Sequence, residues 1–257
     1  FYLCVHSFSG RLMKKKKELL RIFQTSDRLL AILIDPDKVD FSNLENLIQH
    51  LPKATTHLFV GGSTVEENLT EKLVRQLKAK TPLPIFIFPG DYTQITNEAD
   101  ALLFLSLLSG RNPEFLIEQQ VKSVEKLKNT SLEIIPTAYL LIDGGRETSV
   151  QRVSKTLPMK QENVQAIVNT ALAGEYSGKQ LIYLEAGSGA STKVSTAIIS
   201  AVKKEVSIPI IVGGGIRSKK EIEEAYQAGA TMVVVGTAFE DNPEFFTSAS
   251  KTVEVSK

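Results

Sequence analysis

Short apolar runs rich in branched residues recur along this chain and alternate with longer amphipathic stretches. Eight of these runs are predicted to be strands, at residues 29–34, 57–60, 84–88, 101–105, 133–142, 181–184, 208–212 and 231–235. Runs that are apolar at consecutive positions are typical of a parallel sheet covered on both faces. Eight alternating strand and helix units close naturally into an α/β TIM (β/α)8 barrel. An open, doubly wound sheet is the structural alternative.

Helical spacing of apolar residues fills most of the segments between the predicted strands. It predicts helices at residues 43–50, 66–80, 114–128, 161–173, 192–204, 218–228 and 243–252. Polar side chains that can accept a hydrogen bond from the first helical turn precede them and are interpreted as N-caps: Ser42, Thr64, Ser191 or Thr192, Ser218 and Asn242.

The third helix of the barrel is predicted to be missing or vestigial. The stretch from Pro89 to Asp100 carries Gly90 and Asp91 and leaves about a dozen residues for a turn, a helix and a return turn. Loss of this helix would open an apolar groove on the outer wall of the barrel, and such a groove usually binds something. Alternatively, a loop or a partner subunit covers it.

Composition favours one domain without a membrane span or a nucleic-acid surface. No Pro/Gly/Ser-rich linker divides the 257 residues, and 30 basic residues nearly cancel 29 acidic ones, so nothing draws the whole molecule to a nucleic-acid backbone. The only cysteine, Cys4, excludes an internal disulfide framework, and no apolar run approaches the roughly 18 residues of a membrane span. A cytoplasmic location is the default expectation.

The N-terminus is predicted to carry a leader. Met13 is followed by four lysines and resembles a natural start, so residues 1–12 are interpreted as upstream or expression-derived sequence. We therefore expect a single barrel domain over residues 13–257.

Glycines follow the last three predicted strands. The sequence reads Glu185 to Gly189 after the sixth strand, Gly213 to Gly215 after the seventh, and Gly236-Thr237 after the eighth. Glycines let the backbone approach a ligand closely, and the loops after strands seven and eight are the recurrent phosphate site of this fold. Phosphate binding is the favoured interpretation, and tight strand-to-helix turns are the alternative.

Two further groups of strand-end residues suggest chemistry. Asp35 and Asp37 follow the first strand and Ser63 the second, a set suited to Mg²⁺, although Asp-Pro-Asp also forms a simple Asx turn. Glu185 ends an apolar strand beside the phosphate loops and is the candidate general base. Tyr183 shares its side of the strand, where it could hydrogen-bond a substrate hydroxyl or simply pack in the barrel.

Seven motifs, in order from about residue 27 to 245, resemble the geranylgeranylglyceryl phosphate synthase family, in its second, AGSG-type branch. They are IDPDK (34–38), VGGST (60–64), FPG (88–90), SGRNPEFLI (109–117), YLEAGSGA (183–190), VGGGIRS (212–218) and VVVGTAFE (233–240). The combination of YLEAGSG with IDPDK and GGS is more specific than generic barrel glycines. The chain departs from the other branch of the family at Leu33, where that branch has a lysine, and at Thr237, where it commonly has asparagine.

The resemblance implies a Mg²⁺-dependent prenyltransferase of lipid biosynthesis. The 3-hydroxyl of sn-glycerol 1-phosphate would attack C1 of a polyprenyl diphosphate, expected from the family name to be geranylgeranyl diphosphate, and release diphosphate. It places the metal at Asp35 and Ser63 and the proton transfer at Glu185, with Tyr183 beside it. The matched glycerol phosphate positions are Tyr183, Leu184, Glu185, Ala186, Gly187, Ser188, Gly189, Gly214, Gly215, Gly236 and Thr237.

The same resemblance implies a homo-oligomer, either dimer or hexamer, and its lipid product suggests transient membrane contact. Two other functions remain open from the residues alone. A phosphosugar isomerase or lyase would use the same glycines without Mg²⁺ or a lipid groove. A non-catalytic protein that binds a phosphometabolite or a prenyl lipid would not need Glu185.

Overall fold

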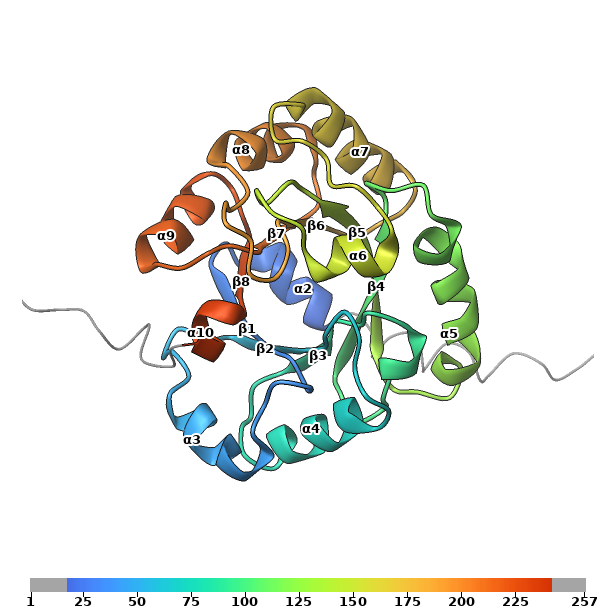
Figure 1. Ribbon diagram of the computed structural model, residues 1–257, viewed down its shortest axis with the longest axis vertical. Coiled ribbons are helices and arrows are strands. Elements are labelled where there is room, and N and C mark those ends of the chain that lie inside the picture. The colour runs from blue at the N-terminus through green and yellow to red at the C-terminus, as the bar shows by residue number, and fades with distance from the viewer. Residues whose placement is uncertain (1–17, 242–257) are drawn as a thin grey trace, which may run out of the picture.

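A computed structural model describes residues 18–241, and within them eight parallel strands close into a barrel (Figure 1). Each strand pairs with the next, and β8 pairs with β1, for example at Ala31 and Val234. The strands are β1 (Leu29–Ile34), β2 (His57–Val60), β3 (Ile85–Ile87), β4 (Ala101–Leu107), β5 (Glu133–Leu141), β6 (Leu181–Glu185), β7 (Ile210–Gly213) and β8 (Met232–Val235). The predicted barrel is confirmed, and the open sheet is wrong.

Helices form an outer ring around the strands (Figure 1). They are α3 (Leu44–Gln49) after the short η1 (Phe41–Asn43), α4 (Leu69–Lys78), α5 (Gln119–Leu127) after the π-helical turn η3 (Glu114–Glu118), α7 (Val164–Tyr176), α8 (Thr196–Glu205) and α9 (Lys219–Gln227). Two short helices, α6 (Ser149–Ser154) and α10 (Thr237–Asp241), follow β5 and β8. The predicted helix at 243–252, its cap Asn242 and the proposed start at Met13 lie outside the described residues, as do residues 1–12. The extent of the domain to residues 13 and 257 therefore stays a prediction.

The connection between β3 and β4 confirms that the third barrel helix is vestigial. In place of a full helix it holds one 3₁₀ turn, η2 (Tyr92–Gln94), and the Asp91 carboxylate accepts a hydrogen bond from the Thr93 amide at 2.7 Å. The chain returns to β4 at Ala101, so too few residues remain for a helix that could span the barrel wall.

Of the predicted N-caps that the structure describes, Ser218 is confirmed, because its hydroxyl accepts from the Glu221 amide at 3.2 Å. Ser42 is wrong, since the Asp40 carboxylate caps this turn and accepts from both the amide and the hydroxyl of Ser42.

The predicted caps Thr64 and Ser191 or Thr192 are also wrong, because their loops run further before a helix begins. Asn68 precedes α4 and Ser195 caps α8. The amides of Ser191 and Thr192 instead donate to the Gly144 carbonyl at 2.8 and 2.9 Å, which holds the loop after β6 against the loop after β5.

The barrel has two apolar layers. One lies between the strands and the outer helices, and the other fills the interior, where Phe59 and Phe86 stack with ring centroids 5.6 Å apart. The sequence analysis assigned no role to α2 (Glu18–Thr25), which buries Leu20 and Phe23 against this inner layer and so closes the end at which the strands begin. Function is therefore confined to the opposite end. Across residues 18–241, no helix is both long and apolar enough to span a bilayer.

Glu133, the first residue of β5, fixes α2 in place. Its buried carboxylate accepts hydrogen bonds from the Leu19 and Leu20 amides, both at 2.8 Å. A negative charge at this position also stabilises α2, because it lies next to the positive end of the helix dipole.

We expect Glu133→Ala to lower the free energy of unfolding by about 1–3 kcal/mol, because it leaves two helix amides without an acceptor. Urea denaturation monitored by circular dichroism would measure the change. The matched control is Glu125→Ala: Glu125 is 82% exposed and pairs with Lys128 on the surface, so the expected change is below about 0.5 kcal/mol. Equal losses in the two variants would contradict a stabilising role for the Glu133 cap.

Candidate active site

A cavity of about 550 Å³ lies at the ends of the strands and continues toward the outer wall between β4 and α5. It gathers most of the residues predicted from the sequence. Those that line it are Asp35, Ser63, Tyr183, Glu185, Ser188, Gly189, Gly214, Gly215, Gly236 and Thr237. Among the other predicted positions, Leu184 and Ala186 pack in the outer apolar layer, and the Gly187 amide donates to Glu185.

Six backbone amides of the glycine loops donate no hydrogen bond to any described residue. They are those at the predicted site positions Ser188, Gly189, Gly214, Gly215, Gly236 and Thr237. The hydroxyls of Ser188 and Thr237 lie 3.0 Å apart, so the loop after β6 meets the start of α10. Unpaired amides that converge with hydroxyls form a binding site for an anion such as phosphate. We call these six amides and two hydroxyls the anion cradle.

Gly213 and Gly214 make room for a carboxylate. A Cβ atom on Gly213 would lie 2.6 Å from Glu185 Oε2 and 2.7 Å from the Tyr183 hydroxyl oxygen, which no real side chain tolerates. Gly214 adopts a φ of 80°, in the left-handed region that glycine enters without strain. The loop after β7 therefore passes directly over Glu185 on its way to the cradle.

Glu185 is a buried carboxyl at the end of β6. Burial raises its pKa to about 7, against the opposing effect of the hydrogen bond that its Oε1 accepts from the Gly187 amide at 2.6 Å. A carboxyl with a pKa near neutrality can exchange a proton with a ligand under ordinary conditions. This is the property required of the predicted general base.

Tyr183 lies two residues before Glu185, and its buried hydroxyl lies beside the Glu185 carboxylate, close enough to lower the pKa of Glu185, but without the geometry of a well-formed hydrogen bond to any described residue. Its ring stacks on Phe88 at 5.1 Å and meets Tyr139 edge-on at 5.4 Å. Burial, and then the negative charge of Glu185, raise the pKa of Tyr183 well above its usual range, so the hydroxyl keeps its proton. A buried hydroxyl in a cavity wall that lacks a well-formed hydrogen bond is available to bond a ligand.

Sequence reasoning missed Tyr139. It lines the cavity from β5, is buried, and has a pKa raised well above the usual range by burial and by the charge of Glu185. The signal was available only in the register, because Tyr139 pairs with Tyr183 across β5 and β6. In the sequence pattern alone, Tyr139 is indistinguishable from the other apolar residues of a long predicted strand.

On the opposite side of the cavity, Asp35 lies against the loop after β2. A Cβ on Gly62 would lie 2.6 Å from Asp35 Oδ1, so this glycine admits the carboxylate next to Ser63. Asp35 also accepts from the Asp37 amide at 3.2 Å and lies 3.3 Å from Lys38 Nζ. The turn interpretation is thus correct for the backbone, while the 18%-exposed carboxylate still lines the cavity.

Within residues 18–241 no group of three or more acidic, histidine or cysteine side chains could hold a metal ion alone. Asp35 with Ser63 nevertheless fits the way proteins bind Mg²⁺, which commonly uses one or two carboxylates and completes its shell with water and substrate phosphate oxygens. Asp37 is less available, because its carboxylate accepts from the Glu66 amide at 3.1 Å.

Gln94, in the vestigial η2, was also missed. Its buried amide group donates to the Gly62 carbonyl at 3.0 Å and accepts from the Gly90 amide at 3.2 Å. It therefore ties the loops after β2 and β3 together beside the candidate metal site. No sequence pattern identifies a glutamine in a short loop as such a link.

The predicted groove on the outer wall is present. Tyr92, Ile95, Phe104, Phe115 and Gln119 continue the lining of the cavity away from the cradle. The Tyr92 amide donates to Gln119 Oε1 at 2.9 Å, which joins η2 to α5 at one edge of the groove. The site thus has a polar end at the glycine loops and an apolar extension along the wall.

Comparison with known proteins gives this architecture a family. The PcrB family model matches residues 24–254. The geranylgeranylglyceryl phosphate synthase of Zunongwangia profunda is 55% identical over 227 residues, 88% of this chain and 97% of its own. The enzyme of the same name from Flavobacterium johnsoniae is 53% identical over 233 residues, 90% of this chain and 96% of its own.

Solved structures agree. The (S)-3-O-geranylgeranylglyceryl phosphate synthase of Thermoplasma acidophilum, in complex with its substrate sn-glycerol-1-phosphate, superimposes with a TM-score of 0.81 at 33% identity, over 90% of this chain and 93% of that one. The tryptophan synthase α-subunit of Pyrococcus furiosus, at 12% identity and a TM-score of 0.52, shares the fold alone. The chain therefore belongs to the PcrB family and is an enzyme of the geranylgeranylglyceryl phosphate synthase type.

Proposed function

We propose that this enzyme joins the 3-hydroxyl of sn-glycerol 1-phosphate to C1 of a polyprenyl diphosphate, with geranylgeranyl diphosphate as the expected donor, in a Mg²⁺-dependent reaction. The product is an ether-lipid precursor, and diphosphate is released. The observation that carries this proposal is the buried Glu185, with a pKa of about 7, directly beside a cradle of six unpaired amides.

The cradle is suited to the phosphate of glycerol 1-phosphate. Backbone amides and the hydroxyls of Ser188 and Thr237 supply donors on several sides, so the phosphate anchors the molecule at one end. The glycerol hydroxyls then extend toward Tyr183 and Glu185, whose polar atoms lie next to Gly213. Anchoring one end of a small substrate in this way orients its reactive end.

Glu185 would take the proton of the attacking hydroxyl. As the new carbon–oxygen bond forms at C1, the bond from C1 to the diphosphate oxygen breaks, and its electron pair leaves with the diphosphate. The hydroxyl proton passes to a Glu185 Oε atom, and the protonated Tyr183 hydroxyl can hold the glycerol oxygen in line.

Asp35 and Ser63 are the residues that would hold Mg²⁺, and bound Mg²⁺ would supply positive charge to the diphosphate. Lys38, which lies 3.3 Å from Asp35, adds a cation on the same side of the cavity. The apolar extension past Phe104 and Phe115 accommodates an isoprenoid chain, which a filled barrel interior could not hold. This extension also disfavours a phosphosugar isomerase or lyase, whose small substrate would leave it unused.

The function is tested by incubating the full chain with labelled sn-glycerol 1-phosphate, Mg²⁺ and prenyl diphosphates of several lengths. We expect a labelled ether product, and its loss on addition of EDTA. Glu185→Gln should lower turnover by about 10²–10⁴-fold, because the amide cannot accept the proton, while glycerol phosphate still binds. Absence of product from the wild-type chain under every condition would refute the proposed activity.

The raised pKa of Glu185 predicts that the difference in the free energy of unfolding between the wild type and Glu185→Gln depends on pH. The unfolded chain ionises Glu185 near 4.5 and the folded chain near 7, so the wild type loses stability as the pH rises through this window. The glutamine variant has no such loss. We expect the free energy of unfolding of the wild type, relative to that of Glu185→Gln, to fall by roughly 3 kcal/mol from pH 4 to pH 8, measured by urea denaturation. A difference in the free energy of unfolding that does not change with pH would contradict the raised pKa of Glu185.

Asp35→Asn should raise the Mg²⁺ concentration needed for half-maximal activity by about tenfold or more, because it removes the charge that holds the metal. The control is Asp37→Asn, which lies two residues away and whose carboxylate is engaged by the Glu66 amide. We expect its Mg²⁺ dependence to stay close to that of the wild type. An unchanged Mg²⁺ dependence in Asp35→Asn would leave Asp35 only its role in the turn.

A further inference from the structure

The anion cradle is built mainly from two separate loops whose spacing must be held. The loop after β6 (residues 186–195) supplies Ser188 and Gly189, and the loop after β7 (residues 214–218) supplies Gly214 and Gly215. These amides are useful to one phosphate group only if the two loops keep a fixed distance. The strands hold one end of each loop, and the other ends need a separate restraint.

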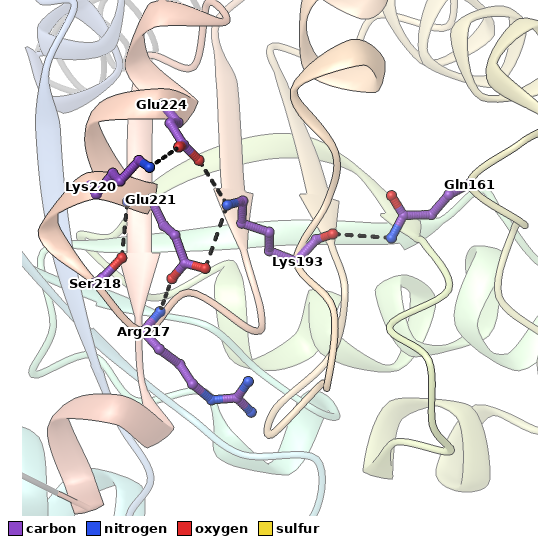
Figure 2. Close-up of polar contacts among 7 residues, drawn as sticks. All are labelled: Gln161, Lys193, Arg217, Ser218, Lys220, Glu221 and Glu224. Carbon is purple, nitrogen blue, oxygen red and sulfur yellow. Dashed lines mark hydrogen bonds and ion pairs between the residues drawn. The ribbon is translucent and has the colours of Figure 1, made fainter.

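Lys193 reaches from the first loop to the helix that follows the second. Its Nζ atom lies 2.8 Å from Glu224 Oε2 and 3.5 Å from Glu221 Oε1, both on α9 (Figure 2). The Lys193 side chain is 25% exposed, so solvent screens these ion pairs less than it screens a surface pair. Hydrogen bonding and charge from Glu224 and Glu221 raise the pKa of Lys193 despite its partial burial.

The main chain of Lys193 is anchored as well. Gln161 donates to the Lys193 carbonyl at 3.0 Å (Figure 2). It also donates to the Asp143 carbonyl at 2.8 Å and accepts from the Ser195 amide at 3.0 Å. Together with the Ser191 and Thr192 amides, which donate to the Gly144 carbonyl, these bonds tie the backbone on both sides of Lys193 to the segment that follows β5. Lys193 is therefore held both at its main chain and at its side-chain Nζ atom.

Glu221 passes this restraint to the cradle. Its second oxygen, Oε2, accepts from the Arg217 amide at 2.7 Å, and the Arg217 guanidinium donates back across the gap to the Ala190 carbonyl at 2.7 Å. Gly215 packs against the main chain at Lys193, because a Cβ on it would lie 3.1 Å from the backbone nitrogen of Lys193. A shift of Lys193 would thus move both loops of the cradle.

We propose that Lys193 is a positioning residue, which sets the spacing of the two glycine loops for a phosphate group by bridging to Glu221 and Glu224. The inference rests on the proposed function, since it assigns the cradle to the phosphate of glycerol 1-phosphate. Lys193 does not line the cavity that contains Glu185, so we expect it to act on binding and to leave the chemistry of bound substrate intact.

Lys220 provides a matched comparison. It pairs with the same Glu224, at 3.9 Å, but it lies on α9 itself and is 86% exposed (Figure 2). It therefore carries the same charge to the same partner without connecting the two loops.

The test measures sn-glycerol 1-phosphate binding to the full chain by calorimetry, together with KM and kcat. We expect Lys193→Met to weaken binding and raise KM by about tenfold, with kcat changed less than about threefold. Lys193→Arg should restore most of the affinity, because a guanidinium can bridge both carboxylates. Lys220→Met should bind like the wild type. Glu224→Gln, which removes the nearest partner of Lys193, should weaken binding in the same direction.

Each contrary result is decisive. Unchanged affinity in Lys193→Met, an equal loss in Lys220→Met, or equally weak binding by the arginine and methionine variants would overturn the positioning role. A fall in kcat at unchanged affinity would do so too. If the wild-type chain itself fails to bind glycerol 1-phosphate, the proposed function falls first, and this inference falls with it.

Discussion

The burial of one carboxyl group at the end of β6 shapes the whole catalytic end of this barrel. Glu185 is enclosed by aromatic side chains and backbone, and burial raises its pKa to about 7. Such a group is tolerated only if its neighbours leave room, so the adjacent turn after β7 consists of glycines whose missing side chains would otherwise collide with it. The same glycines release backbone amides toward the cavity. One constraint therefore accounts for both the proposed proton acceptor and much of the proposed anion site.

The missing third helix shapes the opposite side of the cavity. Removing a helix from a barrel exposes the apolar face of β3 and β4, and the chain uses the gap as an extension of the cavity instead of covering it. The structural work of the helix passes to single residues. Gln94 bonds the loops after β2 and β3 to each other, and the Tyr92 amide bonds to Gln119 on α5. The cavity thereby has a polar end and an apolar end, which suits the proposed pair of one small phosphate and one long isoprenoid substrate.

Strand positions were predictable from the sequence because both faces of each strand are buried, which gives continuous apolar runs with clear ends. Strands β1 and β2 were predicted to the residue, and the others to within two residues. Helix starts were less predictable. Ser191 and Thr192 have the composition of caps, but their amides serve the loop that carries the cradle, so α8 begins only after Ser195. Tyr139 and Gln94 could not be found at all, because their roles depend on barrel register and on a loop contact across the chain.

Helix α9 shows why this site needs three glycine loops. A helix N-terminus after β7 would be a natural place for phosphate, and the sequence places Ser218 there. In the structure that terminus is already occupied: the Ser218 hydroxyl accepts from the Glu221 amide, and the Glu221 carboxylate accepts from the Arg217 amide. Two amides at this end of the helix, those of Arg217 and Glu221, are thus satisfied by the protein itself. In the proposed function, phosphate recognition is therefore assigned to the turns that precede the helix and to the start of α10, where the amides donate to no described residue. The hydrogen bonds at this capped helix end restrain the loop that precedes it.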